Sequence, residues 1–171
     1  MPGRSQGFPP IAAPDAQVLI LGSLPGRMSL ERRQYYAQPQ NGFWRLMGTL
    51  FGAGPEVPYE ERTARLVAHR VAVWDVCKAA VREGSLDAAI DLATVIPNDF
   101  STFLRAHPAI SLVCTNGGTA TRLYQRRVLP TLPADLRALP VRPLPSTSPA
   151  HAAMRFEHKL EQWRIVAAHV S

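Results

Sequence analysis

The sequence predicts an α/β fold in which helices cover both faces of a parallel sheet of four strands. Two observations lead to this prediction. Short apolar runs bounded by glycine or proline recur along the chain, and segments with helical spacing lie between them. Strands that alternate with helices form parallel sheets, because each connection crosses back over one face. The chain has 171 residues, 46% of them hydrophobic, which suits one domain with a sizeable core.

The four expected strands are the apolar runs. Residues 17–23, QVLILGS, are continuously apolar up to a glycine, as in a central strand that is buried on both faces. The second and third strands are expected at 71–77 and 110–118. The fourth falls within 138–150, where several prolines favour a position at the edge of the sheet.

Helical spacing and end signals predict the helices. The segment 43–52 ends at a glycine, and 58–70 begins with proline and carries early glutamates. Further helices are expected at 98–108, at 119–129 and at 149–170, with a short helix capped at Ser85. Residues 1–16, rich in proline and glycine, are expected to form an extended N-terminal arm, and 17–171 a single domain.

Charge and cysteine content limit the classes of function. The net charge is +6, and all basic residues except Lys78 and Lys159 are arginine. Arginine makes bidentate contacts with phosphate, so the bias permits nucleic-acid binding, although a GC-rich genome also produces it. Cys77 and Cys114 lie in apolar runs and are expected to be buried thiols in a reducing compartment. No metal-ligand spacing, signal sequence or membrane span is found, so we expect a cytoplasmic protein without metal or cofactor.

The expected carboxyl ends of the strands carry the most unusual residues. In parallel sheets, ligands bind at these ends. The ends fall at Gly22 and Ser23, at Asp75, at Asn116, and in the segment 145–148. The sequence therefore predicts one binding site at this edge of the sheet.

The polar stretch between the first strand and the first helix contains groups suited to a nucleobase. Tyr36 and Phe43 can stack on a flat base, although core packing is the alternative for Phe43. Asn41 offers both a hydrogen-bond acceptor and donors. Arg27 and Arg33 are candidates for phosphate contacts.

Two later segments also contain candidate ligand groups. Asn116 is a candidate base-binding residue, and it begins a glycine turn, NGG, which suits either one phosphate or a plain turn. The segment LPSTSPAHA places Ser146, Thr147 and Ser148 between prolines, and a helix cap needs only one of them. The other hydroxyl groups suit a phosphate chain, and His151 is either a donor beside it or a solvated helix residue.

In chain order, the segments GSLPG, YYAQPQNGFW, VWDV, GSLDAAI, PNDF, NGG and LPSTSPAHA resemble the uracil-DNA glycosylase superfamily, and most closely its DNA-deoxyinosine (hypoxanthine-DNA) glycosylase branch. The resemblance extends from about residue 18 to residue 163. It implies a three-layer α/β/α sandwich around a four-stranded parallel sheet, in agreement with the pattern above.

The resemblance also implies catalytic roles. The segment GSLPG matches the loop that faces the scissile bond, which implies a catalytic role for Ser23 and base-binding roles for Gly22, Leu24 and Pro25. Many branches have Asn, Asp or Glu in this loop to orient the attacking water, and this chain has none there. In the deoxyinosine branch the asparagine before the Phe-Trp pair is thought to serve instead, which here is Asn41.

Further roles follow from the same resemblance. Tyr36 matches the aromatic residue that stacks on the flipped base, and Asp75 lies where other branches have an asparagine that recognises the base. The 146–148 segment matches the loop that pinches the DNA backbone. His151 lies where related sequences often have asparagine.

The function implied is a monofunctional DNA glycosylase that removes hypoxanthine from deoxyinosine in base excision repair. Lys78 is the one lysine near the predicted site, and it is a weak candidate for a Schiff base. Alternatives are a uracil or xanthine glycosylase of the same superfamily and a non-catalytic nucleic-acid-binding domain. A nucleotide hydrolase or phosphotransferase is disfavoured because phosphate-loop and metal motifs are absent. The expected partner is DNA, bound by a monomer.

Overall fold

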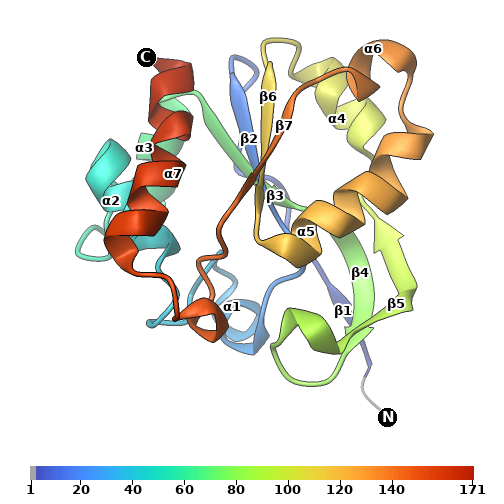
Figure 1. Ribbon diagram of the computed structural model, residues 1–171, viewed down its shortest axis with the longest axis horizontal. Helices are drawn as coiled ribbons and strands as arrows, with labels where there is room; N and C mark the ends of the chain where they lie inside the picture. Colours follow the sequence, from blue (N-terminus) through green and yellow to red (C-terminus); the bar gives the residue numbers. More distant parts are fainter. Residues whose placement is uncertain (1–2) are drawn as a thin grey trace.

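The computed structural model describes residues 3–171 and has a four-stranded parallel sheet at its centre (Figure 1). The strand order is β3-β2-β6-β7, with all neighbours parallel. The strands are β2 (Val18–Gly22), β3 (Val71–Asp75), β6 (Leu112–Asn116) and β7 (Val141–Leu144). In this register Gly22 pairs with Asp75, and Asn116 with Leu144, so the carboxyl ends lie side by side. The predicted fold class is confirmed, and the proline-containing strand lies at an edge.

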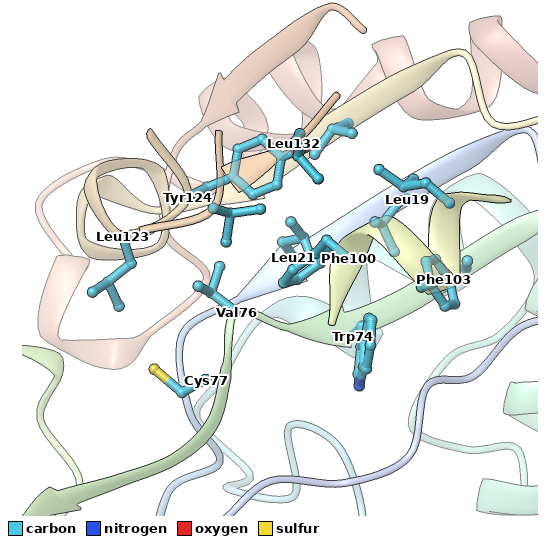
Figure 2. Close-up of a cluster of buried hydrophobic side chains, with 14 of the residues drawn as sticks. Leu19, Leu21, Trp74, Val76, Cys77, Phe100, Phe103, Leu123, Tyr124 and Leu132 are labelled. Atoms are coloured by element: carbon cyan, nitrogen blue, oxygen red, sulfur yellow. The ribbon is translucent and has the colours of Figure 1, made fainter. Parts of the chain in front are cut away.

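Helices cover both faces of this sheet (Figure 1). One face carries α2 (Phe43–Phe51), α3 (Tyr59–Ala68) and α7 (Phe156–Val170), and the other carries α4 (Phe100–Ala106), α5 (Gly118–Leu123) and α6 (Ala134–Arg137). The side chains of β2 alternate between the two faces, as a strand requires. Val18 and Ile20 pack with the first group, whereas Leu19 and Leu21 pack with the second. Figure 2 shows this second core, in which Leu19 and Leu21 lie close to Phe100 and Tyr124.

Two expected helices differ from those observed. The helix expected at 119–129 begins as α5 and continues as one wide turn, η2 (Tyr124–Val128), followed by a 3₁₀ turn, η3 (Leu129–Thr131). The helix expected at 149–170 is interrupted: a 3₁₀ turn, η4 (Pro149–His151), is capped by Ser148, and α7 starts only at Phe156. The extended backbone of Arg155, with ψ 152°, separates the two.

A second, antiparallel sheet was not predicted. It has the order β1-β4-β5, formed by β1 (Arg4–Gln6), β4 (Cys77–Arg82) and β5 (Ile90–Pro97). The strand expected at 71–77 ends at Asp75, and the chain then continues into β4. The short helix expected near Ser85 is only a 3₁₀ turn, η1 (Asp87–Ala89).

The N-terminal arm is part of this second sheet. Of the segment expected as an extended arm, residues 1 and 2 lie outside the described residues. Arg4–Gln6 pair with β4, and Ile11 forms an antiparallel bridge with Val73 of the central sheet. The arm therefore connects the edges of both sheets.

Further expectations concern cysteines, membranes and metals. Cys77 and Cys114 are buried free thiols, as predicted. Within residues 3–171, no helix has the length and apolar character needed to cross a bilayer. The same residues contain no group of three or more His, Cys, Asp or Glu that could hold a metal ion.

Candidate active site

A pocket of about 690 Å³ opens at the carboxyl ends of the central strands. In Figure 1 this is the lower end of the sheet, where α1 (Arg27–Arg32), the β4–β5 connection and the coil before α7 come together. The pocket is lined by residues from six parts of the chain, which are 22–31, 35–41, 75, 85–88, 116–119 and 146–151. Because the strands are parallel, loops that are distant in sequence meet at this one edge.

Most predicted site residues line this pocket. They are Gly22, Ser23, Leu24, Pro25, Arg27, Tyr36, Asn41, Asp75, Asn116, Ser146, Thr147, Ser148 and His151. Phe43 and Arg33 do not. Phe43 is fully buried behind Tyr36. Arg33 follows α1 in a left-handed conformation and lines a separate cavity beside the N-terminal arm.

Tyr36 forms an aromatic wall of the pocket. Its ring stacks on Phe43 with a centroid distance of 4.1 Å and an interplanar angle of 8°. The Phe43 ring in turn packs edge-on against Trp44 and Trp163, so that Tyr36 is supported by the core. The Tyr36 backbone has φ 53°, a left-handed conformation that is unfavourable for a bulky residue and is held here by its surroundings. Burial raises the pKa of Tyr36, so its hydroxyl stays neutral.

Gly22 lets two polar groups approach the end of β2. A Cβ atom at this position would collide with Oδ1 of Asp75 and would lie 2.8 Å from the Tyr36 hydroxyl. The pairing of Gly22 with Asp75 in the sheet brings that carboxyl beneath the tyrosine. Only glycine leaves room for both side chains.

Asp75 is a buried carboxyl group whose charge is poorly compensated. It is 4% exposed, and its Oδ2 has no hydrogen-bond partner among residues 3–171. Burial, together with the negative charge of Asp87, raises the pKa of Asp75 to about 7, and the positive charge of Arg82 opposes this shift. Asp75 lines the pocket, so its carboxyl group is a candidate acceptor for a ligand that donates a hydrogen bond, while Oδ2 itself is sealed from solvent.

Asn41 is held by the loop that precedes α2. Its Oδ1 accepts a hydrogen bond of 2.9 Å from the backbone N–H of Phe43, and its own backbone N–H donates to Gln38. The next residue, Gly42, donates to the carbonyl of Thr147, which joins this loop to the 146–148 segment. An amide oxygen has two lone pairs, so Oδ1 retains one site for a water molecule.

The side-chain amide of Asn116 forms hydrogen bonds within the protein, and these bonds hold the 146–148 segment in place. Its Oδ1 accepts from the backbone N–H of Thr147 at 3.0 Å, and its Nδ2 donates to the Thr147 hydroxyl at 3.0 Å and to the Tyr36 hydroxyl at 3.3 Å. Thr147 is only 2% exposed, so its hydroxyl serves this internal contact. Ser146 and Ser148 are partly exposed on either side of it, and His151 is exposed at the rim.

The sequence analysis missed one carboxylate at this site, that of Asp87 in the β4–β5 connection. Asp87 Oδ1 accepts a hydrogen bond of 2.6 Å from the Ser23 hydroxyl and lies 3.8 Å from Nη1 of Arg82. The Arg82 side chain is 2% exposed, and it donates to the carbonyls of Leu24 and Pro25. Asp87 belongs to the segment GSLDAAI, which the sequence analysis uses for the start of a short helix and for the family resemblance, without a site role for this carboxylate.

Comparison with known proteins identifies the protein family. The family model described as "Uracil DNA glycosylase superfamily" matches residues 9–167, and the chain belongs to this family. The resemblance predicted from the short motifs is thereby confirmed.

Two curated relatives and one solved structure are similar to this chain. The chain is similar to a hypoxanthine DNA glycosylase of Methanosarcina barkeri, with 40% identity over 115 residues that cover 67% of this chain and 72% of the relative. A hypoxanthine DNA glycosylase of Methanosarcina acetivorans is 38% identical over 135 residues, covering 74% and 84%. The solution NMR structure of a candidate uracil DNA glycosylase from Methanosarcina acetivorans superposes with a TM-score of 0.80 at 33% identity, covering 98% of this chain and 99% of that one.

Proposed function

We propose that this protein is a monofunctional DNA glycosylase that excises hypoxanthine from deoxyinosine in base excision repair. The relatives named hypoxanthine DNA glycosylase support this substrate. The observation that carries the proposal is the combination of a supported aromatic ring, Tyr36, with the unsatisfied carboxyl of Asp75 in one pocket. The first group binds the face of a base, and the second binds its edge.

Access to the glycosidic bond requires that the nucleotide leave the duplex. Extrusion costs a few kcal/mol, and less for a mispaired base such as hypoxanthine. Stacking on Tyr36 returns roughly 1–3 kcal/mol. Because Phe43 already stacks on one side of Tyr36, the ring has little freedom to lose when the base arrives.

Asp75 supplies selectivity at the base edge. In its ionised form, which predominates above its pKa of about 7, the Asp75 carboxylate accepts the N1–H of hypoxanthine, whereas adenine has no hydrogen at N1 and presents a lone pair there. Uracil and xanthine also carry ring N–H groups, and so do guanine and thymine, so this contact excludes adenine and cytosine but does not by itself separate deaminated bases from guanine or thymine. The choice among them depends on the shape of the pocket, which the experiment below tests.

The bond then breaks with positive charge developing on the sugar. The carbon–nitrogen electron pair leaves with the base, which spreads the charge over O6 and its ring nitrogens. Asn41 positions the water that adds to the anomeric carbon, using the lone pair of Oδ1 that the Phe43 amide does not occupy. The fixed loop preceding α2 keeps this acceptor in place before substrate arrives, so little reorganisation is needed.

The rim of the pocket provides contacts with the DNA backbone. Ser146 and Ser148 flank the buried Thr147 and line the opening, in a segment that Asn116 holds. Their Oγ atoms accept from the N–H groups of Ser148 and Ala150, which leaves each O–H able to donate to a phosphate oxygen. Arg27 and His151 are both exposed and line the opening. With a net charge of +6, the protein also attracts the phosphate chain over a longer range.

A panel of duplex and single-stranded oligonucleotides carrying one inosine, uracil or xanthine tests the function. We expect base release from inosine, detected as strand breakage only after alkali treatment. Release from uracil or xanthine but not inosine would assign a sister activity in the superfamily. Binding without release from any of the three would support a non-catalytic role, and breakage without alkali would contradict the monofunctional assignment.

Tyr36 provides a second prediction. Tyr36→Ala should lower turnover and weaken binding of inosine DNA by about 5- to 150-fold, because base stacking is worth roughly 1–3 kcal/mol. Tyr36→Phe keeps the ring and loses only the 3.3 Å contact with Asn116, so its effect should be within about threefold. Single-turnover rates and fluorescence anisotropy measure both quantities. Equal losses in the two variants would argue against stacking.

A further inference from the structure

The loop GSLPG contains no carboxylate, yet a carboxylate reaches the same place from the other sheet. Asp87 lies in η1, within the connection between β4 and β5, and lines the pocket together with Tyr36 and Asn41. The Ser23 hydroxyl donates to its Oδ1 at 2.6 Å. Ser23 of the GSLPG loop thus supplies the hydrogen bond that holds the Asp87 carboxylate.

Two contacts fix one oxygen of Asp87 and leave the other available. Oδ1 accepts from Ser23 and also lies 3.8 Å from the buried Arg82 guanidinium. For Oδ2, the described part of the chain supplies no hydrogen-bond donor. A carboxylate anchored through one oxygen can present the other to a water molecule.

Arg82 connects this carboxylate to the loop at the end of β2. The guanidinium group donates to the backbone carbonyls of Leu24 and Pro25 as well as facing Asp87. It therefore sets the position of the loop and of the carboxylate relative to each other. A buried arginine with this set of partners is a rigid link between the two sheets.

We propose that Asp87 accepts the proton of the attacking water, with Ser23 and Arg82 as positioning residues. This inference rests on the proposed function, and it supplies the base that an amide such as Asn41 is too weak to be. The water oxygen bonds to C1′ as the C1′–N9 electron pair leaves with hypoxanthine. The water proton passes to Asp87 Oδ2 and then to solvent, which protonates the departed base, so no other reactant is needed.

The local electrostatics agree with this role. Burial raises the pKa of Asp87, although the hydrogen bond from Ser23 and the charges of Arg82 and Arg122 reduce the shift. A carboxylate with a raised pKa is a better proton acceptor. Its negative charge also stabilises the positive charge that develops on the sugar.

The test compares Asp87→Asn with a matched control, Glu83→Gln. Asparagine keeps the size of the side chain and an oxygen for the Ser23 hydroxyl, but it cannot take a proton. Glu83 is an exposed carboxylate in the same connection and does not line the pocket. Two quantities are measured: the single-turnover rate on an inosine duplex, and affinity for the same duplex made uncleavable by a 2′-fluoro substituent.

We expect Asp87→Asn to lower the rate by about 100-fold or more while affinity and melting temperature stay close to the wild-type values. Glu83→Gln should match the wild type in every measurement. An Asp87→Asn rate within threefold of the wild type would overturn the inference, and so would a loss of rate matched by an equal loss of affinity. If the wild-type protein releases no base from the panel, the proposed function fails instead, which separates the two failures.

Discussion

Asn41→Ala is expected to lower the single-turnover release of hypoxanthine by about 100-fold or more, the size of effect found when one preorganised polar group is removed from an active site. The physical reason is the loss of the acceptor that holds the attacking water. Without this acceptor, the water adopts many orientations beside the sugar. The entropy cost of ordering the water is then added to the activation free energy. Affinity for inosine DNA should change little, because Asn41 acts on the water and not on the base.

The same substitution also removes a structural contact, which must be separated from catalysis. Asn41 Oδ1 accepts from the Phe43 backbone amide, so its loss should lower the free energy of unfolding by roughly 0.5–1.5 kcal/mol. Asn41→Ser provides a shorter side chain with an oxygen for this amide and should recover stability without recovering the rate. Gln40→Ala, a change to a neighbouring exposed amide outside the pocket, is the matched control. Wild-type rates in both Asn41 variants would exclude it as the residue that positions water.

Asp75→Asn is expected to stabilise the protein at alkaline pH but not at pH 4. The pKa of Asp75 is raised from 3.8 to about 7 in the folded state. A raised carboxyl pKa gives a contribution to stability that is fully present below the unfolded pKa and is lost as the pH rises through the folded one. The wild type therefore loses stability between about pH 4 and pH 7, by up to roughly 4 kcal/mol, since each pKa unit corresponds to about 1.4 kcal/mol.

Asparagine has no charge to bury, so the variant should lack this loss. The measurement is the difference in melting temperature between variant and wild type at pH 4, 6 and 8, which should grow with pH. Asp135→Asn serves as control, because Asp135 is exposed and its pKa is lowered by the hydrogen bond from Arg105. A difference that is constant or falls with pH would show that the Asp75 carboxyl is not destabilised in the folded state. The expected gain would also mean that the carboxyl is retained for function at the expense of stability.

The central sheet was predictable because its signals are local. The run Val18–Gly22 is buried at every position, so its sequence is apolar throughout and ends at a glycine where the pocket begins. The positions of Asp75 and Asn116 at the ends of their strands follow from the same pattern. Once the strands are known to be parallel, their ends must meet, and the mouth of the site can be placed without coordinates.

The second sheet was not predictable for a physical reason. In β5 only Ile90 and Val95 are buried, and Leu92 and Ile96 are exposed, so no regular alternation marks a strand. The Thr94 hydroxyl accepts from the Val81 amide within an irregular ladder. Asp87 depends on this sheet for its position, so its approach to Ser23, which is 64 residues away in sequence, could not be inferred.

The two aromatic residues of this site show a different limit of prediction from sequence. Tyr36 and Phe43 have similar chemistry and lie in one polar stretch, so sequence alone favours base stacking for both or leaves Phe43 between two roles. The structure separates them by depth: Phe43 is fully buried, and Tyr36 covers it at the pocket wall. Depth depends on the turn at Tyr36, where φ is positive, and this conformation has no distinct signal in a residue other than glycine.

The stack of Tyr36 on Phe43 has a consequence for which lesions can enter. In the proposed complex the flipped base would be the third of three parallel rings, on Tyr36 and Phe43, and the Phe43 ring is held in place by edge-on contacts with Trp44 and Trp163. A planar base of either one or two rings is therefore expected to make full contact with the Tyr36 ring, whereas a saturated or puckered lesion, which has lost its planarity, is expected to lose part of this contact and to bind more weakly.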